Sequence, residues 1–345
     1  MTYLLSLLYG TGVEIRRRFF EWGILSSKTL RSPVISVGNL TVGGTGKTPF
    51  VAYLAGVLQK LGYQPIILSR GYRGNREKTG AIVSEGSQPL LGPDDCGDEP
   101  YMLARALEGV PVVVGKNRYR AGRSIEDRYE RAIHLLDDGF QHLALKRNLN
   151  LLLIDGTDPF GGGHLLPRGR LREPLRAISR ADMIIVTRSH LATDTDDIEL
   201  AIRHRHPTVS IAYFYHDAVG LKDLRTGKPL LLRDLMNEQV IVLAAIGNPL
   251  VFLRDLAHYQ IRVVDQFLFR DHHVYRQSEL DRAMDRSREL GARCVITTEK
   301  DAVRLKHLQF GEGELMVFQI EARPEDRDEF LRVWKEELES LLPPQ

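Results

Sequence analysis

A glycine-rich loop that ends in a lysine and a threonine lies near the start of the sequence. An apolar segment at 33–40 leads into TVGGTGKTP, after which a helix is expected to begin. Glycines let backbone N–H groups turn inward around phosphate oxygens, a lysine reaches the β- and γ-phosphates, and a Ser or Thr hydroxyl binds Mg²⁺. The positive end of the helix adds to this attraction. The residues predicted to bind a nucleotide are Thr41, Val42, Gly43, Gly44, Thr45, Gly46, Lys47 and Thr48.

The loop departs from the usual P-loop pattern at its first position. The first glycine of that pattern would stand five residues before Gly46, where this sequence has Thr41. We therefore expect the backbone to bend differently where the loop begins. The alternative interpretation is a glycine-rich turn in which GKT occurs by chance.

Carboxylates follow two other apolar segments. AIHLLDDG contains Asp137 and Asp138, and LNLLLIDG contains Asp155. A P-loop enzyme needs a carboxylate at the end of a neighbouring strand to hold Mg²⁺ directly or through water. The doubled aspartate is the better candidate, so we predict a metal site of Thr48, Asp137 and Asp138. The alternative is that the two aspartates are solvated residues of a turn.

Basic residues gather in KNRYRAGR at 116–123 and in LPRGRLREPLR at 166–176. The first cluster is equally compatible with a solvated helix face. The second lies in a proline- and glycine-rich loop with Arg168, Arg170 and Arg172, and arginines suit bidentate contact with phosphate. Glu173 stands among them and could join a metal or nucleotide site.

Histidines and a further acidic motif complete the candidates. DGFQHL places Gln141 and His142 just after the aspartate pair, and FRDHHVY places two histidines after an apolar segment. A lone surface histidine is the alternative for each. GDEP begins a helix with Asp98, where negative charge is favoured for helix stability alone.

Residues 1–25 have the pattern of a helix with one apolar stripe. Glu14 interrupts the segment before it reaches the about 20 apolar residues that a membrane span needs, and its arginines follow the apolar part, unlike a secretory signal. At about 100° per residue the stripe comprises Leu4, Leu8, Ile15, Phe19 and Trp22. An amphipathic helix in a membrane interface and a helix packed on the protein's own core both fit this pattern.

Composition restricts the class of protein. The 345 residues carry a formal net charge of +2, with 43% hydrophobic and 27% charged residues. These values are typical of globular proteins, and the near-neutral charge argues against general nucleic-acid binding. The two cysteines are far apart and outside any CxxC pair, so we predict neither a disulfide framework nor a zinc site.

Alternating strands and helices predict a doubly wound α/β fold with a parallel sheet. The first series of expected strands is 33–40, 64–70, 110–115, 132–139, 149–156 and 181–187, and the second is 239–247, 260–267, 292–301 and 314–320. Helices are expected at 47–61, 98–109, 117–131, 249–258, 277–290 and 324–341. We predict three parts: an amphipathic membrane-associating helix at 1–25, a P-loop domain at 26–217 and a smaller α/β lid domain at 218–345.

Taken together, the motifs resemble one family, tetraacyldisaccharide 4'-kinase, the lipid A 4'-kinase. The resemblance covers most of the chain, and the joint occurrence of its motifs in this order is far more specific than the P-loop alone. The Thr41 start is in keeping with the family. The motifs are VGNLTVGGTGKTP (37–49), SRGYRG (69–74), GDEP (97–100), KNR (116–118), LDDGFQH (136–142), LPRGRLREP (166–174), DHH (271–273) and TEKD (298–301).

The resemblance implies transfer of the γ-phosphate of ATP to the 4'-hydroxyl of an acylated glucosamine disaccharide 1-phosphate, with Mg²⁺. It also implies a peripheral position on the cytoplasmic face of the bacterial inner membrane, and we expect no obligate protein partner. It assigns catalysis to Asp98 and His272, with Lys47 on the phosphates, and it favours His272 over His273. Domain closure would be needed to pair them. The expected substrate contacts are Asn39, Tyr72, Gln141, His142, Arg172 and Glu173.

Two alternatives from other classes share some of these motifs. A membrane-associated P-loop ATPase or GTPase switch would have the loop and the N-terminal helix. Deviant-loop ATPases, however, carry a lysine near the start of the loop, where this chain has Thr41 and Val42, and TEKD has Glu299 where a guanine-specific NKxD segment has lysine. A non-catalytic binding module would leave the acidic residues, the loop and the DHH run unexplained as a set.

Overall fold

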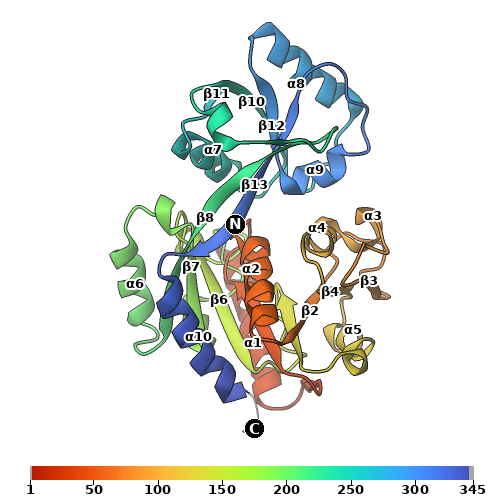
Figure 1. The fold of residues 1–345 in the computed structure, drawn as a ribbon. Coiled ribbons are helices and arrows are strands. Elements are labelled where there is room, and N and C mark those ends of the chain that lie inside the picture. Colours follow the sequence, from red (N-terminus) through yellow and green to blue (C-terminus); the bar gives the residue numbers. More distant parts are fainter. Residues whose placement is uncertain (1, 342–345) are drawn as a thin grey trace. The chain divides into compact units, whose positions relative to one another are not determined.

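The computed structural model describes residues 2–341, which form two compact units (Figure 1). The first unit extends to His216 and resumes at Ala322, and the second is Asp217–Glu321. The chain enters the second unit within strand β8, Ser210–Asp223, and returns within β13, Leu315–Pro324. The polar stretch in which the sequence predicts a boundary is therefore in part an extended strand.

Parallel strands make up most of the first unit's sheet. Their order is β8-β7-β6-β1-β5-β2-β4-β3, and only β3 pairs antiparallel to its neighbour. The predicted strands of the first series are confirmed, whereas the sequence analysis missed β3 and β8. The strands before β8 are β1 Val34–Asn39, β2 Gln64–Ser69, β3 Ala81–Glu85, β4 Pro111–Val114, β5 Ala132–Asp137, β6 Leu149–Asp155 and β7 Met183–Thr187.

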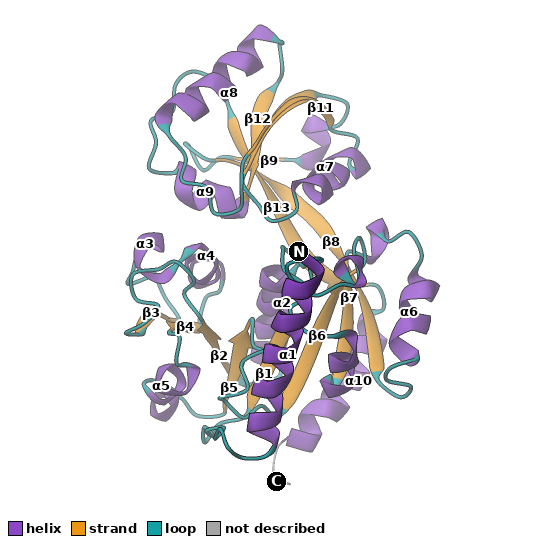
Figure 2. Cartoon of the chain, turned by 180° about the vertical axis from the view of Figure 1, so that it is seen from behind, coloured by secondary structure: helices purple, strands orange, loops and turns teal. Residues whose placement is uncertain are grey.

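Successive apolar residues of these strands enter different cores, which is why the strands read as continuous apolar runs. Ile35 and Val37 pack in the core formed with α2, α4 and α10, and Val34 packs in the core formed with α5. Figure 2 shows α1 in front of the face opposite to α2 and α10. The helices of this unit are α1 Thr2–Glu21, α2 Lys47–Lys60, α3 Pro93–Cys96, α4 Asp98–Ala106, α5 Arg118–Arg123, α6 Thr195–Arg203 and α10 Arg327–Leu341.

The position of α10 corrects the predicted domain division. All of 218–345 was predicted to belong to the second domain, because α10 follows its strands in the chain. In the structure, the buried face of α10 packs with α2 in the first unit's core through Phe330, Trp334 and Leu338. Phe330 also stacks edge-on against Phe214 of β8, with the ring centroids 5.0 Å apart. Burial of this apolar stripe, rather than chain order, decides to which unit the helix belongs.

The second unit is a smaller α/β unit. Its predicted strands and helices are confirmed, except that the strand predicted at 292–301 ends at Thr298 and a helix begins at Glu299. Its strands follow the order β11-β10-β12-β13 and pair in parallel. Successive residues of β10 again enter different cores, with Val240 in one and Ile241 in the other. Its elements are β9 Pro229–Leu230, β10 Gln239–Ala244, α7 Pro249–His258, β11 Arg262–Leu268, α8 Gln277–Glu289, β12 Cys294–Thr298 and α9 Glu299–Leu305.

Helix α1 leaves its predicted apolar stripe uncovered in this structure. Its polar side chains attach it to the first unit, since Ser6 Oγ donates to the Leu165 carbonyl at 2.9 Å and Tyr9 Oη donates to the Arg172 carbonyl at 3.0 Å. Within residues 2–341, no helix combines the length and the apolarity that crossing a bilayer requires. The exposed fractions of the stripe are 61% for Leu4, 61% for Leu8, 47% for Ile15, 37% for Phe19 and 65% for Trp22.

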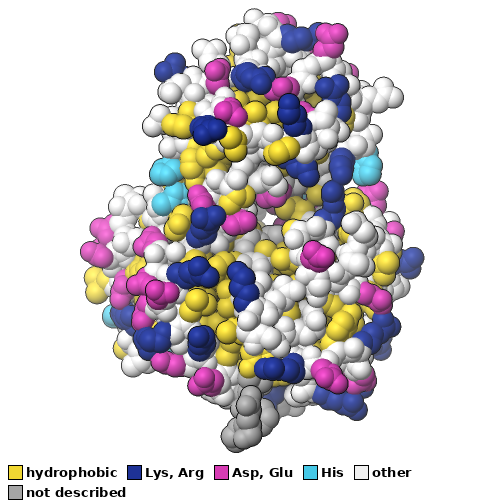
Figure 3. Space-filling model, viewed as in Figure 1, with side chains coloured by type: hydrophobic (Ala, Val, Ile, Leu, Met, Phe, Trp, Pro, Cys, Tyr) yellow, Lys and Arg dark blue, Asp and Glu magenta, His cyan; other side chains and the backbone are white. Residues whose placement is uncertain are grey.

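Charged side chains of both signs are interspersed on the face of the molecule shown in Figure 3. This distribution accords with the near-neutral formal charge of +2. Local groups, rather than one broad field, therefore set the electrostatics of any site on this face.

Candidate active site

The predicted site residues follow the carboxyl ends of parallel strands. The P-loop follows β1, Ser69 ends β2, Asp137 ends β5, and Asp155 ends β6. Because these strands pair in parallel, their carboxyl ends meet at the same edge of the sheet, where α/β proteins bind their ligands.

The P-loop leads into α2 with its amide groups available. Gly46 adopts a left-handed conformation at the N-cap of α2, with φ of 75°. Among residues 2–341, no backbone hydrogen bond uses the N–H groups of Gly43, Gly44, Thr45 or Gly46. Such a row of unused donors at a helix N-terminus fits a polyphosphate.

Lys47 is held over the same edge by two neighbours. Its Nζ lies 3.1 Å from Asn39 Oδ1 and 3.5 Å from Asp138 Oδ1. Asn39 is fully buried, and its amide also donates to the Thr41 carbonyl at 2.6 Å. Asn39 was expected to contact substrate, but its polar atoms are engaged with the loop and its lysine.

Asp137 is a buried carboxylate with one unused oxygen. Ser69 Oγ donates to Oδ2 at 2.9 Å, while Oδ1 has no partner within the described part of the chain. Burial raises the pKa of Asp137 above its usual range, and the nearby charges of Glu99 and Asp138 raise it further. The negative charge of this carboxylate is therefore disfavoured where it lies.

Asp138 has the opposite environment. Arg172 Nη1 lies 2.9 Å from each of its carboxylate oxygens. Burial alone would raise its pKa, but Lys47 and Arg172 outweigh burial and hold the pKa of Asp138 well below its usual range. Its backbone is left-handed, with φ of 52°, a conformation that aspartate tolerates better than most residues. Asp138 is thus kept ionised beside Lys47.

The residues predicted to hold Mg²⁺ fit that ion. The unused buried oxygen of Asp137 is an available ligand, and Thr48 lies in the first turn of α2. Residues 2–341 contain no cluster of three or more His, Cys, Asp or Glu that could bind a metal alone. Mg²⁺ usually binds through one or two carboxylates, substrate phosphates and water, so a two-carboxylate site is appropriate for it.

Asp98 begins α4 and is 6% exposed. The preceding Gly97 has φ of 87°, and a Cβ there would lie 2.9 Å from the Tyr72 carbonyl. The GDEP and SRGYRG motifs therefore pack backbone to backbone, which the N–H of Arg76 reinforces by donating to the Asp95 carbonyl at 2.9 Å. This packing brings the loop that carries Tyr72 beside the start of α4.

In the second unit, the two histidines of the DHH run have different surroundings. His273 Nε2 lies 2.8 Å from Glu279 Oε2, and its ring stacks on Phe269 with centroids 4.4 Å apart. His272 has left-handed φ of 62°, and its ring nitrogens lie 3.5 Å from Lys300 Nζ and 3.4 Å from Arg304 Nη2. His273 therefore has an evident structural role, whereas His272 lies in a charged cluster.

The TEKD motif builds the platform for this cluster. Thr298 and Asp301 flank the start of α9, which also carries Lys300 and Arg304. Asp301 is buried and accepts hydrogen bonds from Tyr275 Oη at 2.9 Å and from the Ala245 N–H at 3.1 Å. Lys300 Nζ lies 3.0 Å from Asp271. The motif thus fixes α9 against β10 and against the segment that contains His272.

The predicted substrate residues differ in their surroundings. Gln141 and Arg172 lie with the site, because Gln141 donates to the Asn39 carbonyl at 3.0 Å and Arg172 binds Asp138. Burial and, to a lesser extent, nearby arginines lower the pKa of His142 to about 4. Glu173, by contrast, pairs with Arg180 at 2.6 Å. Tyr72 is 50% exposed.

Several residues that lie at the site were not predicted from the sequence. Arg118, whose segment was compatible with a solvated helix face, is 4% exposed, and burial lowers its pKa to about 10 despite the nearby Asp137 and Asp138. Arg188 and the buried His216 lie beside the P-loop. Arg188 immediately follows the carboxyl end of β7, a position that could have identified it.

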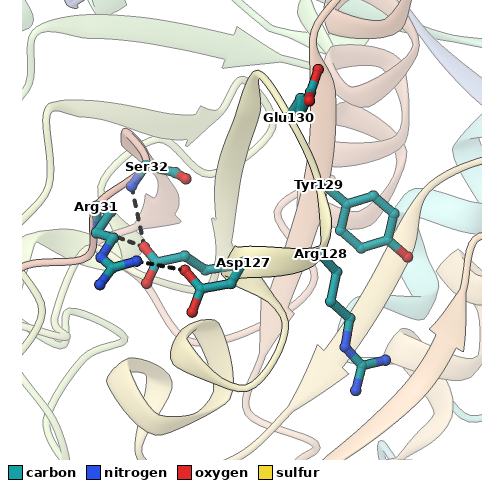
Figure 4. Close-up of a pocket in the computed structure, with 7 residues that line it drawn as sticks. Arg31, Ser32, Asp127, Arg128, Tyr129 and Glu130 are labelled. Atoms are coloured by element: carbon teal, nitrogen blue, oxygen red, sulfur yellow. Dashed lines mark hydrogen bonds and ion pairs between the residues drawn. The ribbon is translucent and has the colours of Figure 1, made fainter.

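A separate hollow of about 400 Å³ lies near the amino ends of β1 and β5 (Figure 4). The carboxylate of Glu126, which lines this hollow, accepts hydrogen bonds from the Arg31 and Ser32 N–H groups at 2.5 and 3.2 Å. Because the P-loop follows the other end of β1, this hollow is not part of the candidate active site.

Comparisons with known proteins identify the family to which the chain is similar. A family model described as tetraacyldisaccharide-1-P 4'-kinase matches residues 1–339. Relatives named tetraacyldisaccharide 4'-kinase from Halothermothrix orenii and Syntrophus aciditrophicus are 37% and 39% identical, over 87% and 88% of this chain and 81% and 83% of theirs. The crystal structure of LpxK from Aquifex aeolicus in complex with ATP has a TM-score of 0.74 and 31% identity, covering 99% of this chain and 98% of that one.

Proposed function

Because this chain belongs to the tetraacyldisaccharide-1-P 4'-kinase family, we propose that it transfers the γ-phosphate of ATP to the 4'-hydroxyl of a tetraacylated glucosamine disaccharide 1-phosphate in lipid A biosynthesis. The observation that carries this proposal is the arrangement at the edge of the sheet. A P-loop with unused amides, Lys47 and the Asp137–Asp138 pair meet there.

Positioning and charge stabilisation supply most of the catalysis, because phosphoryl transfer offers little covalent chemistry to a protein. In our proposal, Lys47 and the amides of the loop bind the β- and γ-phosphates, and Asn39 orients Lys47 by accepting its hydrogen bond. Asp98 accepts the proton of the sugar hydroxyl, and His272 is the second catalytic residue. Arg172 keeps Asp138 ionised and stands beside the transferred phosphoryl group.

Mg²⁺, when bound, would neutralise part of the negative charge of the phosphates. We assign its protein ligands to Thr48 and the Asp137–Asp138 pair. The support is the unpartnered Oδ1 of Asp137 and the raised pKa of Asp137, because burial and neighbouring carboxylates disfavour its negative charge and a bound cation would offset that cost.

Turnover measurements test the activity directly. Purified protein should consume ATP only when detergent-solubilised tetraacyl disaccharide 1-phosphate is present, with one phosphorylated glycolipid formed for each ATP. A membrane-associated switch would instead hydrolyse ATP or GTP slowly without an acceptor. Acceptor-independent hydrolysis at the same rate would therefore reject the kinase proposal.

We also propose that the chain is a peripheral protein of the cytoplasmic face of the inner membrane, bound through the exposed stripe of α1. Leu4 and Leu8 are each 61% exposed, and Trp22 is 65% exposed. Arg168 lies over the ring of Tyr3, with its guanidinium 5.3 Å from the ring centroid. Apolar residues beside arginines suit the boundary between acyl chains and anionic headgroups.

Replacement of both Leu4 and Leu8 with serine should lower binding to phosphatidylethanolamine–phosphatidylglycerol vesicles at least about tenfold, since each buried leucine contributes roughly 1.5–3 kcal/mol. Co-sedimentation measures the bound fraction. Leu200→Ser is the matched control, because Leu200 on α6 is 69% exposed but lies outside the stripe. Equal binding by the wild type and the double variant would exclude α1 as the anchor.

A further inference from the structure

Two arginines donate hydrogen bonds to backbone carbonyl groups of the P-loop. Arg170 donates from Nε and Nη2 to the Val42 carbonyl at 3.2 and 2.9 Å. Arg188 donates from Nη1 to the Gly44 carbonyl at 2.7 Å. The two carbonyls are two residues apart, so the guanidinium groups hold alternate peptide units of the loop.

Each arginine has its own aspartate, and both aspartates come from the chain that leaves β6. Arg170 Nη1 lies 2.8 Å from Asp158, and Arg188 Nη1 lies 2.5 Å from Asp155. The second pair is largely buried, with side-chain exposures of 11% and 5%. Asp155 Oδ1 is fixed in turn by the Thr157 hydroxyl at 2.7 Å. The arginines are therefore oriented before any ligand binds.

Peptide planarity turns these contacts into control of the amide groups. In a trans peptide the C=O and the following N–H point in opposite directions. A guanidinium that holds the Val42 carbonyl therefore directs the N–H of Gly43 to the other side of the loop, and one that holds the Gly44 carbonyl does the same for the N–H of Thr45. Within residues 2–341, neither N–H is used in a backbone hydrogen bond.

The contacts also account for two features of the loop sequence. A Cβ at position 43 would lie 2.2 Å from Arg170 Nη2 and would displace the guanidinium, and the φ of 116° at this position also favours glycine. At the start of the loop, Thr41 pairs with Leu171 in an antiparallel bridge, and the Val42 N–H donates to the Arg170 carbonyl at 2.8 Å. The neighbouring segment thus shapes the part of the loop that lacks the usual first glycine.

We propose that the pairs Arg170–Asp158 and Arg188–Asp155 are positioning residues that preset the P-loop amides for the phosphates of the nucleotide. This inference rests on the proposed function, because it takes the ligand to be ATP. Neither arginine needs to touch the nucleotide, since each acts through a carbonyl of the loop.

Nucleotide affinity and steady-state kinetics test the proposal on the full chain. Arg188→Ala should weaken binding of a fluorescent ADP analogue about 10- to 100-fold, the usual effect of losing a charge-assisted hydrogen bond. The KM for ATP should rise similarly, while the KM for the lipid acceptor stays within twofold. Arg188→Lys, which keeps a positively charged donor group, should recover part of the affinity.

Arg203→Ala is the matched control. Arg203 also contacts a carboxylate, Glu199 at 3.2 Å, and a backbone carbonyl, Val209 at 2.6 Å, but it lies at the end of α6. It should leave nucleotide affinity unchanged. If Arg188→Ala does not fold, Arg170→Gln provides the same test, because Arg170 is 38% exposed. Wild-type affinity in a folded variant of either arginine would overturn its role, whereas failure of the wild type to bind nucleotide would overturn the proposed function.

Discussion

Replacement of Asp98 with asparagine should lower kcat roughly 10²- to 10⁴-fold, the usual contribution of a general base. Asparagine keeps the volume of the side chain at the first position of α4 but cannot accept a proton at working pH. The KM for ATP should change little, because we assign the phosphates to the P-loop. Initial rates of phosphorylated glycolipid formation at saturating ATP measure the effect.

Asp95→Asn is the matched control for this substitution. Asp95 lies three residues before Asp98 in the chain and is 40% exposed, with Arg76 as its 4.0 Å partner. It should retain near-normal turnover. Turnover of Asp98→Asn within a few-fold of the wild type would remove Asp98 as the base.

The two adjacent histidines offer a second comparison. His272→Asn should reduce kcat, and combining it with Asp98→Asn should add little further loss, because residues that act as a unit are not additive. His273→Asn removes the contacts with Glu279 and Phe269, so it should lower thermal stability while the folded fraction keeps its kcat. Additive effects of the Asp98 and His272 substitutions would exclude their pairing.

Asp137→Asn should inactivate the enzyme and yet stabilise the protein without nucleotide and Mg²⁺. The pKa of Asp137 is raised by burial and by nearby carboxylates, so its ionisation at neutral pH opposes folding. Asparagine removes that charge and retains a group that can bond to Ser69. At pH 8 the expected gain in the free energy of unfolding is roughly 1–3 kcal/mol, measured by urea denaturation.

The pH dependence has a defined sign. Between the unfolded pKa of about 3.9 and the higher folded pKa, the folded state binds more protons, so wild-type stability decreases as pH rises. The advantage of Asp137→Asn should therefore be small near pH 4 and reach its maximum above the folded pKa. Asp138→Asn should behave in the opposite way and destabilise at neutral pH, because the folded pKa of Asp138 is depressed. A destabilised Asp137→Asn variant at pH 8 would contradict this account.

The sequence predicts the fold well where strands are buried on both faces. Segments such as 33–40 and 149–156 read as apolar runs because β1 and β6 enter different cores with successive residues. Strand β8 was missed because its burial is mixed along 14 residues and polar side chains interrupt it. The unit to which α10 belongs depends on packing against α2, which no local pattern reveals.

The candidate site could be predicted where chemistry is concentrated in short motifs. Lys47 and the Asp137–Asp138 pair follow strands, and parallel pairing brings them to one edge. The role of Arg188 could not be derived in this way, because its contact with the Gly44 carbonyl joins positions 144 residues apart. The burial of Arg118 was equally invisible, since a basic segment gives no indication of which guanidinium lies inside.

The packing of α10 has a consequence for how the protein is made. The helix that carries Lys47 shares its core with Phe330, Trp334 and Leu338, which leave the ribosome after every residue of the second unit. Domains usually fold in order during synthesis, but here the nucleotide-binding unit cannot complete its interior until α10 has been synthesised. The second unit, contained within Asp217–Glu321, has all its residues available earlier and can fold while the first still waits for its final helix.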